Sequence, residues 1–330
     1  MLSTLVTRSM RALGLASAVV AGVLPGSAIA QPAFPSHPLR LVIAFGPGGV
    51  ADTTSRIVAD RLGEKLGQRV IVENNPGGGG ISAARAVINA APDGHTMALL
   101  TNGTSISVGL FKALPFDPVA DFTAVSKIGA FEFFFGAKGD GPHKTLADFL
   151  KTAKASPGKL NVGTINPGST QHLTALLLKT TAGVEFQWVP FKSGPDLVVA
   201  LLRGDIDAAV EGAAALKANV DDGKLRLLAT SAPKRSPLYP DVPTVQESGG
   251  GSFDVTSWNG LFVKAGTPPA IVGRLTAAMQ EVLGEAEVKA KLLTVGIVAE
   301  PTTSADMAAF LKADIAKWAK VIDDNKIEKR

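Results

Sequence analysis

The chain has 330 residues, a formal net charge of +4, no cysteine and four histidines. The lack of cysteine excludes a disulfide-stapled scaffold and an anchor attached through cysteine. No run of basic residues stands out, which argues against nucleic acid or an anionic membrane as a partner. The length suggests two domains.

The first thirty residues have the pattern of an export signal. Arg8 and Arg11 precede the apolar segment Leu13–Leu24, and Ala28-Ile29-Ala30 is typical of a cleavage site. This apolar segment is too short to cross a membrane, and no later stretch reaches about eighteen apolar residues. We therefore expect cleavage after Ala30 and an exported, soluble product whose net charge falls from +4 to +2 with the loss of two arginines.

A strand, a glycine loop and a helix are predicted between Leu39 and Leu66. The run Leu39–Phe45 is rich in β-formers, and Ser55–Leu66 has apolar residues at helical spacing. The glycines of the loop Gly46–Gly49 let the backbone approach a ligand, and a helix starting near Asp52 or Thr53 points free N–H groups into that space. An anion would be stabilised there. The alternative interpretation is a tight turn without a ligand.

Strands and helices continue to alternate after this helix. Strands are expected at Arg69–Glu73 and Thr96–Leu100, with a helix at Ser82–Ala90 between them. Short connections of this kind favour a mostly parallel sheet covered on both faces. Ligands bind at the carboxyl ends of such strands, so the loop Thr101–Ser105, with Asn102 and Thr104, is expected beside the glycine loop.

A second strand, Pro-Gly loop and helix follow one another in the second half of the chain. The apolar segment Val125–Phe135 is long enough to pass from one domain into another. After it, the predicted strand Leu160–Thr164 leads into Asn166-Pro167-Gly168-Ser169-Thr170 and a helix, with Ser169 as N-cap and His172 in the first turn. If the two loops face each other across a cleft, each wall carries a positive helix end.

Later segments complete the second domain and return to the first. The strand Glu185–Val189 leads into a loop that contains Phe191, and Phe253–Val263 predicts the return crossing. Helices are expected at Ile271–Leu283, Glu285–Val295 and Ser304–Val321, the last packing on the first domain.

Two enzymatic interpretations have weak support in the sequence. The pattern Gly46-x-Gly48-x-x-Ala51, with Glu73 ending the second strand, fits a loose dinucleotide-binding fingerprint, but Pro47 removes a loop N–H. Ser169 follows a strand as a nucleophile would, but the G-x-S-x-G pattern of hydrolases is absent.

The remaining polar residues suggest little chemistry of their own. The histidines are scattered without a metal-ligand spacing, so no metal site is predicted, and His95 is expected to be a surface turn residue. His172 would either help to hold a ligand or only pack. Asp205 would bind only a ligand with an amino or hydroxyl group.

Nine short motifs follow one another across nearly the whole mature chain. They are Phe45–Asp52, Val72–Gly80, Ala91–Gly94, Phe116–Pro118, Gly168–His172, Val189–Gly194, Gly204–Asp207, Pro240–Thr244 and Ser257–Phe262. In this order they resemble the tripartite tricarboxylate transporter receptor family, also called the Bug family, of periplasmic solute-binding proteins. The resemblance implies an α/β fold of the two-lobed, type II-like Venus flytrap kind, in which each lobe is a doubly wound, mostly parallel sheet. Residues 31–134 and 257–330 would form lobe 1, and residues 135–256 lobe 2.

The resemblance also implies a function and a site. It predicts a periplasmic, non-enzymatic receptor without a cofactor, which captures a small carboxylate or dicarboxylate between the lobes for uptake or sensing. Its partners would be the organic acid and membrane transporter subunits or a sensor protein, with no nucleic acid, and the chain would act as a monomer. The alternative is an exported α/β enzyme, dinucleotide-dependent or a hydrolase, acting on a small acid. The expected ligand-binding residues are Phe45, Gly48, Gly49, Asp52, Thr53, Asn102, Thr104, Gly168, Ser169, Thr170, His172, Phe191 and Asp205.

Four positions depart from the usual family pattern. Gly46 stands where Ala is common, Asn75 where Arg is common, Phe191 where Tyr is common and Glu211 where Asp is frequent. Phe191 removes a hydroxyl from the expected cleft, which favours a ligand with an apolar or aromatic body.

Overall fold

The structure is a computed structural model that describes residues 34–77 and 80–329, so the predicted export signal lies outside the described residues. The strands are β1 (Leu39–Ile43), β2 (Val70–Asn74), β3 (Thr96–Thr101), β4 (Phe122–Lys138), β5 (Asn161–Ile165), β6 (Gln187–Phe191), β7 (Ala208–Gly212), β8 (Leu225–Thr230), β9 (Thr256–Lys264) and β10 (Val298–Ala299). The helices are α1 (Val50–Leu66), α2 (Ile81–Ile88), α3 (Asn102–Leu110), α4 (Leu146–Ala155), α5 (Thr170–Ala182), α6 (Gly194–Arg203), α7 (Ala213–Asp221), α8 (Pro269–Gly284), α9 (Ala286–Thr294) and α10 (Ser304–Asp324).

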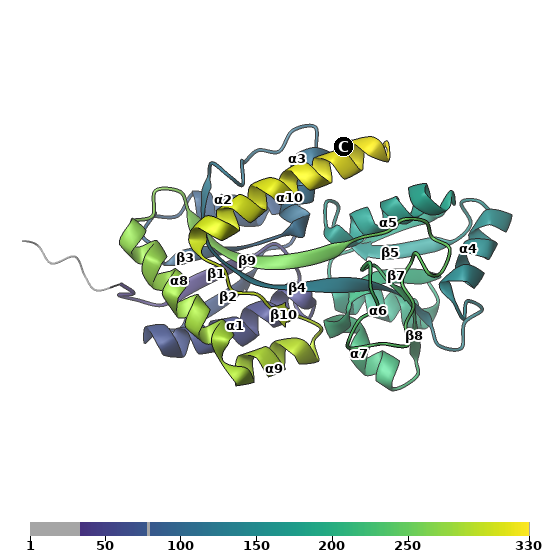
Figure 1. Cartoon of the computed structure of the whole chain (residues 1–330), viewed down its shortest axis with the longest axis horizontal. Helices are drawn as coiled ribbons and strands as arrows, with labels where there is room; N and C mark the ends of the chain where they lie inside the picture. Colours follow the sequence, from purple (N-terminus) through teal and green to yellow (C-terminus); the bar gives the residue numbers. More distant parts are fainter. Residues whose placement is uncertain (1–33, 78–79, 330) are drawn as a thin grey trace, which may run out of the picture. The chain divides into compact units, whose positions relative to one another are not determined.

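The strands form one mixed sheet in the order β2-β1-β3-β9-β4-β7-β5-β6, with β8 and β10 also paired to β4. Parallel pairs occur in two groups, β2-β1-β3 and β6-β5-β7. The long strands β4 and β9 run antiparallel to each other between these groups (Figure 1). The chain leaves the first group of strands along β4 and returns to it along β9. Because these two passages run in opposite directions, β4 and β9 are antiparallel.

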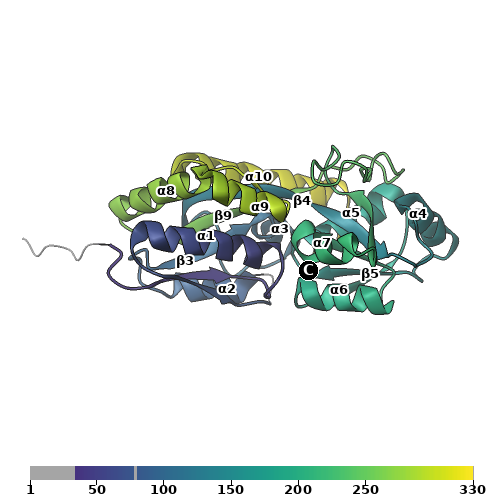
Figure 2. The same cartoon turned by 90° about the horizontal axis from the view of Figure 1, so that it is seen from below.

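Strand β4 belongs to both groups of strands. It pairs with β9 as far as Glu132, and from Phe133 onward with β7 and β8. Helices lie on both sides of the strands, as the view from below also shows (Figure 2). The predicted crossing at Val125–Phe135 therefore contains the point at which the partners change, although the strand extends further at each end.

Helix α1 shows how local sequence sets its own limits. It begins at Val50, two residues before the earliest predicted start, and it ends at Gly67, whose φ of 73° is the left-handed conformation that favours glycine. Its residues Val58, Leu62 and Leu66 are buried at helical spacing. The helix therefore places its N-terminus directly after the glycine loop.

The segment predicted as a loop after β3 is instead the start of helix α3. The Thr101 side chain accepts a hydrogen bond from the Gly103 N–H at 3.2 Å, and the Thr104 hydroxyl accepts one from the Thr101 N–H at 3.3 Å. These reciprocal contacts form a capping box, and Ile106 and Leu110 bury the inner face of the helix. The prediction was wrong because Thr was taken as a loop former, not as a cap.

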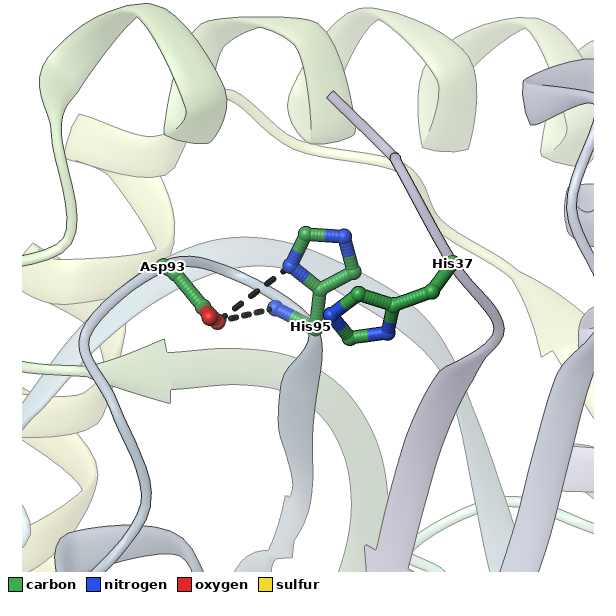
Figure 3. A group of neighbouring side chains, drawn as sticks. All are labelled: His37, Asp93 and His95. Carbon is green, nitrogen blue, oxygen red and sulfur yellow. Dashed lines mark hydrogen bonds and ion pairs between the residues drawn. The ribbon is translucent and has the colours of Figure 1, made fainter. Parts of the chain in front are cut away.

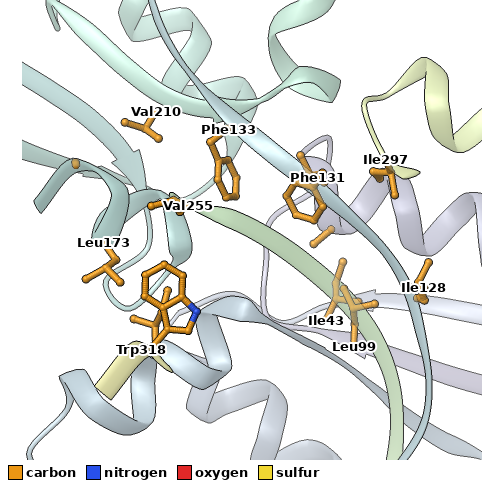
Figure 4. Packing of buried hydrophobic residues seen from close by; sticks show 14 of the residues in the cluster. Ile43, Leu99, Ile128, Phe131, Phe133, Leu173, Val210, Val255, Ile297 and Trp318 are labelled. Atoms are coloured by element: carbon orange, nitrogen blue, oxygen red, sulfur yellow. The ribbon is translucent and has the colours of Figure 1, made fainter. Parts of the chain in front are cut away.

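A continuous apolar cluster connects the two groups of strands (Figure 4). It includes Ile43 of β1, Phe131 and Phe133 of β4, and Val210 of β7. Trp318 of the C-terminal helix belongs to the same cluster and is fully buried. Helix α10 also packs on the first group, because Met307 and Leu311 share a second cluster with residues of β1 and β3, as the sequence predicts.

Candidate functional site

One cavity is lined by the N-terminal ends of several helices. We call it the helix-end cavity; it has a volume of about 30 Å³. Its lining residues are Phe45, Gly46, Gly49, Val50, Ala51, Thr101, Phe131, Phe133, Ile165, Thr170, Gln171, Ser193, Gly194, Glu211, Ser257 and Asn259. Helices α1, α3, α5 and α6 therefore each bring their first turn or N-cap residue to it. Their N–H groups and dipoles make this space favourable for negative charge.

Glycine at position 46 allows the first loop to approach the loop between β6 and α6. A Cβ atom at Gly46 would lie 2.9 Å from the Lys192 carbonyl oxygen and 2.9 Å from Ser193 Cβ. Gly48 has a φ of 82° and faces Pro195 in the same way, with 2.8 Å between a Cβ and Pro195 Cγ. The departure from alanine at position 46 is thus explained by a close contact between the two loops.

Asp52 holds the shape of this loop from outside the cavity. Its carboxylate accepts hydrogen bonds from the Gly48 N–H at 2.9 Å, Asn74 Nδ2 at 2.9 Å and Arg56 at 2.8 Å. Burial alone would raise the pKa of Asp52, but the bonds from Arg56, Gly48 and Asn74 outweigh it and the pKa is lowered. Asn74 also donates to the Phe45 carbonyl at 3.0 Å, which connects the carboxylate to the cavity wall.

A second cavity of about 30 Å³ adjoins the first and shares Phe45 and Thr101 with it. We call it the apolar cavity, because its remaining walls are mostly alanine and leucine side chains of α2 and β3, together with Val42 of β1 and Phe116. Thr104, Gly168 and Ser169 contribute its polar edge. The Ser169 hydroxyl caps helix α5 by accepting the His172 N–H at 3.1 Å, as its predicted N-cap role requires.

The predicted site residues divide between these cavities and other parts of the molecule. Phe45 lines both cavities, Gly49 and Thr170 line the helix-end cavity, and Thr104, Gly168 and Ser169 line the apolar cavity. The predicted residues that line neither are Gly48, Asp52, Thr53, Asn102, His172, Phe191 and Asp205.

Asn102 and His172 have buried contacts beside the site. Asn102 Nδ2 donates to Asp314 at 3.0 Å, and its Oδ1 accepts from the Thr170 hydroxyl at 3.1 Å. The His172 ring lies 4.1 Å from the Trp188 ring, centroid to centroid, and its Nδ1 accepts the Gly168 N–H at 3.3 Å. Both residues therefore shape the turns that reach the cavities.

Phe191, the last residue of β6, and Asp205 line neither cavity. Phe191 packs against an apolar cluster that contains Phe134 and Leu197. Asp205 lies in the turn between α6 and β7, where its N–H donates to the Ala200 carbonyl at 3.0 Å. Because Phe191 lines neither cavity, the structure does not support the expectation that this residue favours an apolar ligand.

Two polar residues that are absent from the predicted ligand-binding set, Glu211 and Asn259, line the helix-end cavity. Both are almost completely buried, at 1% and 0% exposure. Glu211 lies near the carboxyl end of β7, and Asn259 lies in the motif Ser257–Phe262. The rule that ligands bind at strand ends could have identified the first, but only the fold brings the second beside it.

Glu211 is a buried carboxyl group that pairs with no basic side chain of the described residues. Its Oε1 accepts the Gly212 N–H at 2.7 Å and Gln171 Nε2 at 3.2 Å. Burial raises the pKa of Glu211 to about 7, and these two hydrogen bonds only partly oppose the change. Among the described residues that line this cavity, none is a lysine, arginine or histidine.

A histidine cluster elsewhere contains His37, Asp93 and His95 (Figure 3). His95 Nε2 accepts the Ser36 N–H at 3.1 Å, and Nδ1 lies 3.3 Å from the Asp93 carboxylate. The two imidazole rings stack at 3.8 Å with an interplanar angle of 21°, and one nitrogen of each ring lies within 4.8 Å of the other and of an Asp93 carboxylate oxygen. The cluster fastens the segment before β1. His95 is buried, so the prediction of a surface turn residue was wrong.

The sequence comparisons place this fold and these loops in a known family. Within the described residues, no helix combines the length and the apolar character needed to cross a bilayer. The sequence model of the tripartite tricarboxylate transporter family receptor matches residues 54–327. The chain belongs to this family. The resemblance found in the nine motifs is confirmed, and the enzyme alternative is set aside because the family consists of receptors.

Solved structures of similar proteins agree with the family and the fold. The chain is 26% identical to the periplasmic binding protein BugD, with a TM-score of 0.86 over 90% of this chain and 100% of BugD. It is 30% identical to R. palustris Rpa4515 with adipate, with a TM-score of 0.86 over 90% of this chain and 100% of that one. It is 32% identical to MatC from Rhodopseudomonas palustris with bound malate, with a TM-score of 0.83 over 88% and 100%. The protein therefore has the periplasmic-binding-protein fold.

Proposed function

We propose that this receptor binds the carboxylate group of a small organic acid in the helix-end cavity and delivers the acid for uptake or sensing. The observation that carries the proposal is the convergence of four helix N-termini on one cavity, whose described lining residues include no basic side chain. Backbone N–H groups and helix dipoles would then supply the positive potential. Malate and adipate in two similar structures support an acid as the ligand class.

The predicted site residues receive different roles in this proposal. Gly49 and Thr170 would contact the acid through their helix ends, and Phe45 would separate the helix-end cavity from the apolar cavity. Asp52 would act indirectly by holding the glycine loop in shape. The apolar cavity would accommodate the hydrocarbon part of a longer acid.

Entry of the acid would require the two lobes to separate. A cavity of about 30 Å³ holds roughly two water molecules, which is less than a dicarboxylate needs. Residues 31–134 with 257–330 would form one lobe and residues 135–256 the other, and the crossing strands β4 and β9 would bend as a hinge. With these boundaries, Val50 and Gly212 would belong to different lobes, and they lie close together, since a Cβ at Gly212 would lie 2.1 Å from Val50 Cγ2.

The predicted export signal and the family support a periplasmic location for the protein. Cleavage after Ala30 would release the mature receptor into the periplasm. There it would act as a monomer and present its acid to membrane transporter subunits or to a sensor protein.

A substitution that fills the cavity tests the proposal directly. A Cβ at Gly49 has no atom within 4 Å, and the φ of −87° suits any residue, so Gly49→Val should fold and still obstruct the ligand. Gly273→Val on helix α8 is the matched control, because a Cβ there also meets open space. Thermal shifts and calorimetric titrations of residues 31–330 with a panel of small acids provide the measurement.

We expect saturating acid to stabilise the wild-type protein and the Gly273→Val control by a few kcal/mol. Gly49→Val should bind at least about tenfold more weakly, since the valine side chain occupies the space needed by the carboxylate. If no acid stabilises the wild type, or if Gly49→Val binds as tightly as the control, the proposed site is incorrect.

A further inference from the structure

Two buried oxygen atoms on residues that line the helix-end cavity accept no hydrogen bond from any described residue. They are Glu211 Oε2 and Asn259 Oδ1. Buried polar atoms are nearly always paired, because leaving one unpaired costs about 1 to 3 kcal/mol. Two such atoms of the same kind at one cavity therefore indicate what the cavity is built to bind.

The orientation of the Asn259 amide is determined by its neighbours. Asn259 Nδ2 donates to the Thr54 hydroxyl oxygen at 3.1 Å. That hydroxyl uses its own hydrogen to reach the Val50 carbonyl at 2.7 Å, so it can only accept from Asn259. The remaining amide atom, Oδ1, is consequently an acceptor.

The Glu211 carboxyl group is oriented in a similar way. Both hydrogen bonds from the protein, from Gly212 and Gln171, go to Oε1. Oε2 lies 3.2 Å from the point where a Cβ at Gly194 would stand, and Gly194 itself lines the cavity. A side chain at position 194 would therefore crowd Oε2.

The charges around the cavity limit the ligand further. Glu211 is the single ionisable residue among the described residues that line it. A plain dicarboxylate would bring two negative charges beside this carboxyl group with no basic side chain to offset them. A ligand that is negative at one end and offers N–H groups at the other would match the helix ends and both acceptors.

We infer that the ligand is a carboxylate that also carries a primary ammonium group, whose N–H groups are accepted by Glu211 Oε2 and Asn259 Oδ1. This inference rests on the proposed function and identifies Glu211 as the residue that selects among acids. An ammonium group fits better than a hydroxyl, because it offers three donors in place of one and its positive charge pairs with the carboxylate. A hydroxy acid would satisfy only one of the two acceptors.

A ligand series that changes one substituent tests this selection. Succinate, malate and aspartate share a four-carbon dicarboxylate skeleton and carry hydrogen, hydroxyl or ammonium at one carbon. Propionate, lactate and alanine repeat the series with one carboxylate, and glutarate, 2-hydroxyglutarate and glutamate repeat it with a longer skeleton. Calorimetric titration of the mature protein with each compound at neutral pH gives the ranking.

We expect the ammonium member of at least one series to bind about tenfold or more tightly than its unsubstituted analogue, with the hydroxyl member between them. Glu211→Gln removes the charge and keeps the shape, so it should reduce this preference about tenfold. Glu132→Gln is the matched control. It lies between Phe131 and Phe133, which line the cavity, and strand alternation directs it to the opposite face.

Each outcome distinguishes the inference from the proposed function. If acids bind but the unsubstituted members bind as tightly as the ammonium members, the ligand inference is wrong and the receptor function stands. An unchanged preference in Glu211→Gln would likewise overturn the role of Glu211. If no acid in any series binds, the proposed receptor function is itself wrong, and the ligand inference falls with it.

Discussion

Two buried carboxyl groups near helix N-termini, Asp52 and Glu211, have opposite electrostatic properties. Asp52 is 4% exposed and accepts hydrogen bonds from Gly48, Asn74 and Arg56, and its pKa is lowered. Glu211 is 1% exposed, has partners on one oxygen only, and its pKa is raised to about 7. Glu211 lies deeper in the protein, so burial raises its pKa more strongly, and its two partners are uncharged, whereas Asp52 also has the charged partner Arg56.

The contrast separates a structural acid from one available to a ligand. The Asp52 carboxylate is fully occupied by the protein and fixes the loop that approaches the ligand. The Glu211 carboxyl group retains an unpaired oxygen at a cavity. A buried acid at a helix end is therefore a candidate binding group when its own protein leaves it incompletely paired.

The largest expected effect is the pH dependence that Glu211 imposes on stability. Its pKa is about 7 in the folded protein and near 4.5 when exposed, so in this interval the folded state holds a proton that the unfolded chain has released. The Glu211 contribution to the free energy of unfolding is therefore fully present below pH 4.5 and falls as pH rises to about 7, by roughly 3 kcal/mol. Glu211→Gln should lack this decline.

Urea denaturation of the wild-type protein and Glu211→Gln, at about pH 4 and about pH 8, measures the difference. The variant should gain stability relative to the wild type at the higher pH. Glu132→Gln, which alters an acid on the neighbouring strand, should follow the wild-type profile. If the free energy of unfolding of all three proteins changed with pH in the same way, the pKa of Glu211 would not be raised in the folded protein.

Replacing Asp52 should have the next largest effect. Asp52→Ala leaves the Gly48 N–H and the Asn74 amide without their acceptor and should lower the free energy of unfolding by about 2 kcal/mol. Asp60→Ala, on an exposed face of the same helix, is the control and should change little. Equal denaturation midpoints for the two variants would show that the Asp52 carboxylate does not stabilise the glycine loop.

The smallest effect is expected at an acid with a basic partner on the surface. Glu73 pairs with Arg40 through two bonds of 2.7 Å, and the Arg40 hydrogen bond lowers the pKa of Glu73. The side chains of Arg40 and Glu73 are 44% and 39% exposed, so Glu73→Gln should cost only about 0.5 kcal/mol at low salt. Thermal denaturation at low and high salt tests this, and a loss that persists at high salt would contradict solvent screening.

The elements of the fold were largely predictable because their signals are local. The glycine loop before α1, the Ser169 cap of α5 and the apolar crossing segment each depend on neighbouring residues. Helix α3 was missed because a capping box of two threonines resembles a polar loop in sequence. The apolar pattern of α1 identified the helix but placed its start two residues late.

The candidate site was predictable only in part. The loops that carry Phe45, Gly49, Thr104 and Gly168 lie at the cavities, because strand ends in an α/β sheet meet along one edge. Asp52 belongs to the same motif as Phe45 and Gly49, but its carboxylate accepts hydrogen bonds from Arg56 and Asn74 and lines neither cavity. The motif thus identified the loop without showing which of its groups faces the cavity.

By itself, the sequence determined the elements and the family of this protein, because helical spacing, caps and glycine turns act over a few residues. Only the tertiary structure decided which buried oxygens remain unpaired. Asn259 meets Thr54 across 205 positions of the chain, and Glu211 meets Gln171 across 40. A hydrogen bond depends on the distance between two atoms in space, so partners so remote in sequence are set by the packing of the strands and helices that carry them.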